Sequence, residues 1–484
     1  MKGSFVQNLI LLVGLNLLVK PLYLLVVETE IQNRVGAENF GNYFALINFS
    51  FILNILLDMG ITNWNTRKTA QDGIISANDY RKLFNIRLAL AALYIIISFS
   101  IGLLLNYDAS QLYILGILSF NQILVSAILF LRSYLTGMHL FKSDSIISVL
   151  DRTLLLAMMA SLLWLIPNAN SFQIEWLVYG QTISYGITFV VALILISRAK
   201  ASEKRSTPVI SSSNILKESF PFALLIMLSM LGYRADSVML ERMSGSHQAG
   251  VYAMGFRFFE AVNMIAYLFA VILLPMFTRQ LNQKENISPL LHLSFKILFT
   301  GTFIISALCC FYPEEILAIV YDGNILSATS PFAWLMVSSL FFSMQYITGT
   351  LITASGRMKP LIYIALGGMI YNIILNIYYI PKEGALGAAK ASCFSQMIIF
   401  IAQIIAMNQM FDTGKVYKLF SRTIIFSVTS ISLGMLLQTD TFVNLNIPYS
   451  WTLMLLGMLS AALITGMLEI KRIPELFGNI LNKK

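Results

Sequence analysis

An arginine and an aspartate, Arg234 and Asp236, interrupt an otherwise apolar stretch of the sequence, LSMLGYRADSVML. A charge deep in a bilayer costs about 3 kcal/mol on insertion scales, so such a side chain normally faces a partner or a wet interior. Residues two apart point to different sides of a helix, so these two side chains each need another partner. Guanidinium groups bind phosphate oxygens in a bidentate manner. The pair therefore suits either an anion-binding interior or ion pairs that join helices, and Arg234 has the further option of reaching toward the membrane surface.

Three more charged side chains, Lys20, Arg257 and Glu260, fall within apolar stretches. Arg257 and Glu260 are three positions apart, so they share one face of a helix and can pair. At the rise of an α-helix, Glu260 lies about 15 Å and Lys20 about 18 Å along the spans that hold them. Together with Arg234 and Asp236 these residues carry a net charge of +1, which suits an anionic ligand. We predict that all five line a central cavity.

Asp58 and Gly60 stand at the end of another apolar stretch, and Arg67 follows them. Because this position is close to the end of a span, we predict that Asp58 and Gly60 act at a gate or a helix end rather than in ligand contact. Lys390 lies just inside a later stretch and is predicted to be an interfacial anchor.

The composition of the chain places these charges in a membrane. Of 484 residues, 57% are hydrophobic and 12% are charged, too few polar groups to coat a water-soluble globule. Apolar blocks of roughly 20 residues recur from end to end, without the two-residue alternation of a β-barrel. Embedded backbone must satisfy its own hydrogen bonds, as helices do. We predict an all-α polytopic protein with about 14 spans, near 8–27, 42–63, 83–105, 111–134, 146–166, 175–197, 218–240, 250–275, 291–312, 331–353, 360–380, 387–409, 420–437 and 449–469.

Lysine and arginine are unevenly divided between the two sides of the predicted spans. Nearly all of those outside the spans lie in alternate connections, whereas the opposite connections hold only Arg34, Arg242 and Lys382. By the positive-inside rule, both termini are expected to be cytoplasmic. The net charge of +9 is then explained by loops that face an anionic leaflet, and no nucleic-acid partner is expected.

A short pattern recurs in the two halves of the chain. Gly41-x-Tyr43 returns as Gly250-x-Tyr252, and each follows a predicted external connection that holds one arginine. Six spans separate the copies, so the two units share one orientation, as in duplicated transporters. The repeat predicts two six-helix lobes around a central cavity, with a C-terminal helix pair. The predicted boundaries are 1–200 for the N-lobe, 201–217 for a cytoplasmic linker, 218–410 for the C-lobe and 411–484 for the helix pair and tail.

The loops and reactive residues argue against an enzyme. No connection is long enough to form a soluble catalytic domain, and no GxxxxGK[ST] phosphate loop is present. The three cysteines lie in apolar spans and the three histidines are far apart, so we expect neither a metal site nor a cofactor. A membrane enzyme such as a repeat-unit polymerase or an acyltransferase is expected to have a long external loop or clustered His, Asp and Arg near one membrane face.

Two patches of sequence resemble a known family. LLDMGITNWNTRKTA (56–70) looks like the second-helix signature of the polysaccharide biosynthesis family of membrane proteins, and YRADSVML followed by AGVYAM resembles its seventh helix and the turn into the eighth. That family belongs to the multidrug/oligosaccharidyl-lipid/polysaccharide exporter superfamily, and its members are similar to O-antigen and capsule flippases. The resemblance implies two lobes, a central polar cavity and alternating access.

From the resemblance and the charges we expect a flippase in the bacterial inner (cytoplasmic) membrane. Its cargo would be a polyprenyl pyrophosphate-linked oligosaccharide repeat unit, carried to the outer leaflet for O-antigen, capsule or exopolysaccharide assembly. The expected partners are this lipid, membrane lipids and polysaccharide-assembly proteins such as a polymerase, with the protein itself a monomer. Coupling to H⁺ or Na⁺ through Asp236 or Glu260 stays open, as does the alternative of a multidrug exporter, whose cavity should be more acidic and aromatic.

Overall fold

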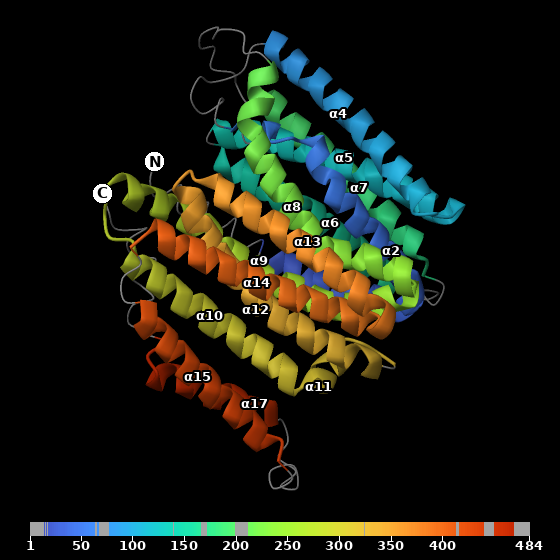
Figure 1. Cartoon of the computed structure of the whole chain (residues 1–484). Helices are drawn as coiled ribbons and strands as arrows, with labels where there is room; N and C mark the ends of the chain where they lie inside the picture. The colour runs from blue at the N-terminus through green and yellow to red at the C-terminus, as the bar shows by residue number, and fades with distance from the viewer. Residues whose placement is uncertain are drawn as a thin grey trace. The chain divides into compact units, whose positions relative to one another are not determined.

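The structure is a computed structural model, and every element in it is a helix (Figure 1). It describes residues 14, 16, 18–62, 65–66, 77–138, 140–165, 172–198, 212–323, 325–412, 416–439 and 450–468. Eleven segments within these residues are long and apolar enough to cross a membrane, and two shorter apolar helices follow, 421–437 and 450–464. The predicted all-α membrane fold is therefore confirmed.

The chain divides into two compact units, Met1–Ala253 and Met254–Lys484. In the first unit α5 packs on α7, α6 packs on α7, and α8 packs on α2. Its elements are η1 (Tyr23–Val27), α2 (Glu28–Leu53), η2 (Asn54–Leu57), α4 (Ala77–Leu104), α5 (Ala109–Gly137), α6 (Phe141–Ala160), η3 (Ser161–Leu165), α7 (Ile174–Arg198), α8 (Ser212–Ser244) and the first turns of α9 (Ser246–Asn282).

A glycine breaks the longest apolar segment in two. Residues 18–57 run as one helical segment of 40 residues, but Gly36 within α2 has φ 81° and ψ 164°, outside the helical region. Only glycine adopts such a conformation readily. The segment therefore holds residues 18–27 of the first predicted span and most of the second, and residues 8–13, 15 and 17 lie outside the described residues. With the two shorter helices, each of the fourteen predicted spans has at least a partial counterpart among the described residues.

The start of α5 shows how the sequence sets a helix end. The backbone N–H of Gln111 donates to Asp108 Oδ1 (2.8 Å), and the backbone N–H of Asp108 donates to Gln111 Oε1 (3.2 Å). This reciprocal pair is a capping box, which satisfies two N–H groups that the first helical turn leaves open. The Gln111 amide is thereby held at the beginning of α5.

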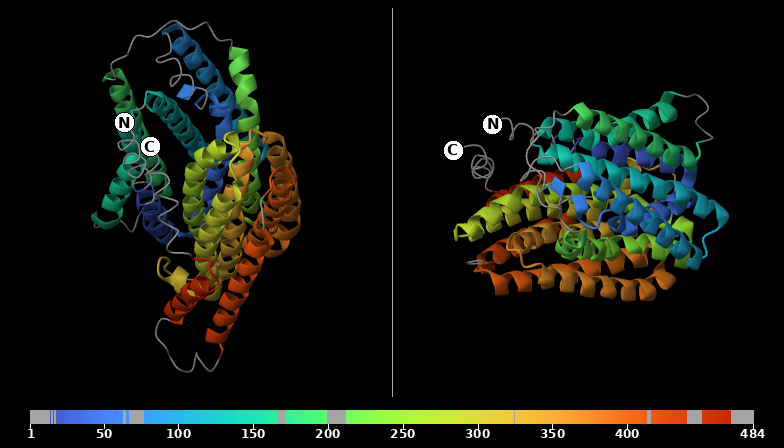
Figure 2. Two further views of the ribbon diagram at one scale, coloured as in Figure 1. Left: turned by 90° about the vertical axis from the view of Figure 1, so that its left-hand side faces the viewer. Right: turned by 90° about the horizontal axis from the view of Figure 1, so that it is seen from above.

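In the second unit, α12 packs on α10 and α14, and α13 packs on α14. The pair formed by α15 and α17 packs on α10 through Phe303, Phe426, Met454 and Met458, all of them buried, and Figure 2 shows these two helices side by side. The elements beyond α9 are α10 (Ser288–Phe311), α11 (Pro313–Ala318), α12 (Leu326–Ala354), α13 (Met358–Glu383), α14 (Ala385–Met410), α15 (Val416–Leu437) and α17 (Ser450–Ile464).

The boundary between the two units falls inside α9, at Ala253 and Met254. The predicted C-lobe includes α8. In the structure, α8 packs extensively on α2 and belongs to the first unit. The assignment of helices to two lobes stays a prediction. Residues 199–211, which include much of the predicted linker, lie outside the described residues.

Candidate functional site

Lys20 lies beside a charged pair on α6 that is built into a membrane-spanning segment. Tyr23, one helical turn after Lys20, lies with its ring against Arg152, and η1 packs on α6. The side-chain amide of Asn16 donates to the hydroxyl of Ser148 (Nδ2 to Oγ, 3.3 Å), which joins the first span to α6. Two cations from different helices are thereby brought close together inside the first unit.

Arg152 is held between aromatic rings rather than by a tight ion pair. Its guanidinium carbon lies 5.3 Å from the ring centre of Tyr23 and 6.0 Å from that of Tyr185, within cation–π range. Its Nε is 4.0 Å from Asp151 Oδ2, too long for a hydrogen bond. The side chains of Arg152 and Asp151 are 24% and 23% accessible. Neither charge is therefore fully enclosed by protein.

Three cations (Lys20, Arg132 and Arg152) and three acids (Glu28, Asp144 and Asp151) lie in this region, so their formal charges cancel. Arg132 is engaged by Asp144, with Nε 2.7 Å from Oδ1. Lys20 and Arg152 are like charges in a low-dielectric environment, and they repel each other unless water or an anion lies near them.

Asp58 lies where the second span ends. Its carboxylate accepts a hydrogen bond from the backbone N–H of Thr62 (3.1 Å) and pairs with Arg87 Nη1 (3.0 Å). Arg87 also donates to the backbone carbonyl of Ser126 (2.7 Å), so the group joins the end of η2 to α4 and α5. Gly60, with φ 84°, allows the turn. The functional role of Asp58 and Gly60 stays a prediction, and Arg67 lies outside the described residues.

Arg234 and Asp236 contact different elements, as residues two apart on a helix must. Arg234 donates through Nη1 to the side chain of Asn48 on α2, and its guanidinium carbon lies 4.6 Å from the ring centre of Phe51. Asp236 is fully buried and accepts a hydrogen bond from the hydroxyl of Tyr252 on α9 (3.2 Å). Arg234 thus joins α8 to α2, and Asp236 joins α8 to α9.

Arg257 and Glu260 belong to the second unit. Arg257 is 1% exposed and donates through Nη1 to the hydroxyl of Tyr321 (2.6 Å). That hydroxyl donates in turn to the backbone carbonyl of Met254 (3.3 Å). Glu260 lies three positions along α9 from Arg257 and is half-buried. The proposed clustering of these two residues with Arg234, Asp236 and Lys20 around one cavity stays a prediction.

Sequence reasoning missed Arg152 and Asp151. Both lie within the predicted span 146–166, but Arg152 was counted with the lysines and arginines of the preceding connection, 132–152, and α6 in fact begins at Phe141. The available signal was the spacing of Asp144 and Arg152, eight positions apart and so on one face of a helix. Among the residues that the structure describes, no group of three or more His, Cys, Asp or Glu side chains is placed to hold a metal ion.

This chain is similar in sequence to an archaeal protein and in fold to solved transporter structures. An archaeal relative, the uncharacterized membrane protein MJ1375 of Methanocaldococcus jannaschii, is 23% identical over 393 residues, which are 77% of this chain and 91% of the relative. The solved structure of the lipid II flippase MurJ in an inward closed conformation is similar, with a TM-score of 0.68 and 16% identity over 96% of this chain and 98% of that one. An inward-facing multidrug resistance MATE family transporter of the MOP superfamily has a TM-score of 0.58 and 12% identity over 81% of this chain and 94% of its own.

Two family models also match. One, described as MatE, matches residues 221–378. The other, described as polysaccharide biosynthesis protein, matches residues 5–281, more than half of the chain. The matched families are transporters and flippases, not enzymes. The resemblance predicted from the sequence is confirmed: the chain belongs to the polysaccharide biosynthesis protein family of membrane transporters.

Proposed function

We propose that this protein is a flippase for a lipid-linked oligosaccharide, and that Lys20 and Arg152 bind the pyrophosphate of the lipid. The cargo would be a polyprenyl pyrophosphate-linked repeat unit, moved from the cytoplasmic to the outer leaflet by alternating access. The product would serve O-antigen, capsule or exopolysaccharide assembly. The family description supports this class of cargo, and the likeness of fold to a lipid II flippase agrees with it.

The physical task of such a protein is to remove a solvation barrier. Each sugar hydroxyl that enters hydrocarbon without a partner costs several kcal/mol, and an ionised phosphate costs far more. A polar path supplies hydrogen bonds in place of water. A pyrophosphate additionally requires cations, which is why accessible positive charges inside the helical bundle are the most informative residues.

A single observation carries the proposal: two cations, Lys20 and Arg152, belong to apolar helical segments that pack on each other. Arg152 keeps 24% of its side chain accessible, and Asp151 lies 4.0 Å from it without a hydrogen bond. The ion pair of Arg132 with Asp144, which joins α5 to α6, is shorter at 2.7 Å, although Arg132 is nearly as accessible at 22%. The difference in distance supports a role in anion binding for Arg152.

The remaining expectations from the sequence complete the proposal. The protein would act as a monomer in the bacterial inner membrane, with both termini in the cytoplasm and a polymerase among the assembly proteins it works with. Coupling to H⁺ or Na⁺ would run through Asp236 or Glu260, since both are carboxylic acids within apolar spans. No cofactor is needed, because translocation makes and breaks no covalent bond.

The test is binding of a polyprenyl pyrophosphate oligosaccharide to purified protein in detergent. Lys20→Gln and Arg152→Gln should each weaken binding about tenfold, the effect of losing roughly one charge-assisted hydrogen bond. Lys359→Gln and Arg198→Gln remove exposed charges and serve as matched controls with unchanged affinity. Equal affinity of all four variants and the parent would remove these residues from the site.

A second function is favoured by one observation. The MatE family model matches residues 221–378, so a multidrug exporter is the alternative. Such a protein would bind organic cations, which Lys20 and Arg152 would repel. Saturable binding of an organic cation that the pyrophosphate lipid does not displace would favour the exporter.

A further inference from the structure

The GxY motif that recurs in the two halves of the chain is part of a longer repeat. Both copies read GxxxxGxY, and corresponding residues are 209 positions apart (41 to 250). The first copy lies in α2 and the second spans the junction of α8 and α9. The shared positions are Gly36, Gly41 and Tyr43 in one copy and Gly245, Gly250 and Tyr252 in the other.

The first glycine of each copy makes the same turn. Gly36 has φ 81° and Gly245 has φ 88°, a left-handed conformation that residues with a Cβ rarely adopt. Gly36 breaks α2 into two helices, and Gly245 separates α8 from α9. Each copy therefore ends one helix and begins the next within a few residues.

The second glycines of the two copies lie against each other. A Cβ on Gly41 would lie 1.9 Å from the carbonyl oxygen of Ser246 and 2.5 Å from the amide nitrogen of Gly250. A Cβ on Gly250 would lie 1.9 Å from the carbonyl oxygen of Ala37. The contact is reciprocal and made by backbone, and only glycine at both positions permits it. Gln32 adds a hydrogen bond from Nε2 to the carbonyl oxygen of Gly250 (2.9 Å).

The tyrosines of the two copies bind different partners. The hydroxyl of Tyr43 accepts a hydrogen bond from Gln181 Nε2 on α7 (2.6 Å). The hydroxyl of Tyr252 donates to Asp236 Oδ2 on α8 (3.2 Å). Each copy is thus attached to its own neighbouring helix, and the glycine pair forms the contact between the copies.

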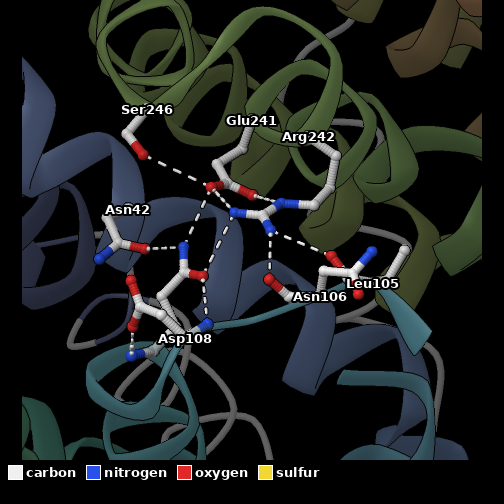
Figure 3. A network of polar contacts seen from close by, with 8 residues as sticks. Asn42, Leu105, Asn106, Asp108, Glu241, Arg242 and Ser246 are labelled. Atoms are coloured by element: carbon white, nitrogen blue, oxygen red, sulfur yellow. Dashed lines mark hydrogen bonds and ion pairs between the residues drawn. The ribbon is translucent and has the colours of Figure 1, made fainter. Parts of the chain in front are cut away.

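A network of polar contacts includes Asn42 and Ser246, one residue from each copy of the motif (Figure 3). Glu241, 4% exposed, accepts a hydrogen bond from Gln111 Nε2 (3.1 Å), and Gln111 also donates to Asn42 Oδ1 (3.0 Å). Arg242 pairs with Glu241 and donates to the backbone carbonyl of Leu105 (3.1 Å). These bonds connect α2, the start of α5 and the end of α8. They lie at the end of the helices that the charge distribution predicts to be external.

We propose that the paired motifs form a latch that closes this end of the transport path and is released during each cycle. Helices in a membrane gain no hydrophobic free energy by associating, so close packing of small residues and interhelical hydrogen bonds determine whether they stay together. A contact built from two glycines and a few hydrogen bonds has no interlocked side chains to disengage, which suits repeated opening. The latch operates for any cargo, so it does not depend on the proposed substrate.

The test measures access to a buried reporter one helical turn from Glu241. Ser237, 2% exposed, is changed by Ser237→Cys in a full chain that lacks its native cysteines. A membrane-impermeant maleimide is applied to intact cells and to inverted membrane vesicles, and the labelling rate is measured in both. No cargo is required, so the result is independent of what the protein transports. The native cysteines to be replaced by alanine are Cys309, Cys310 and Cys393.

Gly41→Ala and Gly250→Ala should each raise the labelling rate about threefold or more in one of the two preparations, because the added methyl group shifts the population toward the open state. Gly186→Ala is the matched control, since its Cβ would meet no atom within 4 Å. Its labelling should equal that of the parent. The preparation in which the rise occurs also identifies the side that the latch closes.

Arg242→Gln provides a second test that leaves both glycines in place. Losing its bonds to Glu241 and to the carbonyl of Leu105 should also accelerate labelling of the reporter, by a smaller factor. Parental labelling of Arg242→Gln in both preparations, with the variant present in the membrane in normal amounts, would overturn the latch even if the glycine variants fail to insert. Parental labelling of inserted glycine variants would overturn it equally.

Discussion

At the scale of single residues, the charges within the membrane-spanning part are of two kinds. Arg132 with Asp144 (2.7 Å) and Arg87 with Asp58 (3.0 Å) form close ion pairs that connect elements of the first unit. Arg152 instead lies between two tyrosine rings and 4.0 Å from Asp151, although its exposure is close to that of Arg132. Close pairs stabilise the fold by neutralising charge, whereas a cation without a close ion pair is available to a ligand. The two kinds should respond differently to substitution.

Arg234→Ala should abolish translocation of a labelled lipid-linked oligosaccharide in proteoliposomes while leaving membrane insertion intact. We expect this because Arg234 contacts Asn48 and Phe51 on α2 and is predicted to serve the transport path. Arg279→Ala removes an exposed arginine and should transport normally. Parental transport by Arg234→Ala would assign that residue to helix packing.

Asp58→Asn should lower the stability of the protein rather than its affinity for cargo. The change removes the charge that faces Arg87 and weakens the bond to the backbone of Thr62, which should cost about 2 kcal/mol. Thermal unfolding in detergent measures the effect, with exposed Glu285→Gln as the control. An unchanged melting temperature would mean that the ion pair contributes no net stability.

The candidate residues could be found from the sequence only where a charge stood inside an unmistakably apolar block. Lys20, Arg234 and Asp236 met that condition. Arg152 lies inside the predicted span 146–166 as well, but it stands near the start of that span, where helix ends are uncertain, and was assigned to the preceding connection. The aromatic partners of Arg152, such as Tyr23, could not be predicted, because hydropathy does not show which helix faces are in contact.

At the scale of elements, helix existence was predictable and helix contacts were not. Spans follow from the number of consecutive apolar residues needed to cross a bilayer, and each predicted span has at least a partial counterpart among the described residues. The GxY repeat marked Gly41 and Gly250 as related positions. The repeat did not indicate that the two glycines are in contact. A sequence shows that a residue is glycine, but it does not show which atoms pack against that residue.

Gly387→Ala should destabilise the contact between α13 and the start of α14. A Cβ at Gly387 would lie 2.4 Å from the carbonyl oxygen of Tyr379, and a backbone atom cannot rotate away as a side chain can, so we expect a loss of about 2 kcal/mol, as for overpacking in a core. Gly367→Ala on α13 meets nothing within 4 Å and should be neutral or slightly stabilising. Equal melting temperatures for the two variants would contradict this packing.

At the scale of the whole molecule, composition and charge distribution sufficed to predict a polytopic all-α membrane protein. The family was predicted from two short patches of sequence, and the family model matches residues 5–281. The grouping of helices was less accessible. Contacts divide the chain between Ala253 and Met254, whereas the sequence repeat predicts a boundary near the start of α8. The two boundaries differ because the repeat reflects duplication of the sequence, whereas the contacts depend on the conformation of the protein.

Sidedness can be measured with single cysteines in a chain without its native ones. By the charge distribution, Glu315→Cys should react with a membrane-impermeant maleimide in intact cells, since the connection between α10 and α12 is expected to be external. Glu285→Cys should react only after permeabilisation. Both positions are exposed, so access to the reagent is the sole difference. The opposite pattern would invert the proposed topology.

The central claim is that the protein moves a lipid-linked oligosaccharide across the membrane. Its most direct test is the sidedness of labelled lipid-linked oligosaccharide in cells that lack the protein and have no redundant carrier. The account predicts that the glycolipid accumulates in the cytoplasmic leaflet and that the parental chain, but not Arg152→Gln, restores its appearance in the outer leaflet. Arrival of the glycolipid in the outer leaflet at the normal rate without the protein would contradict it.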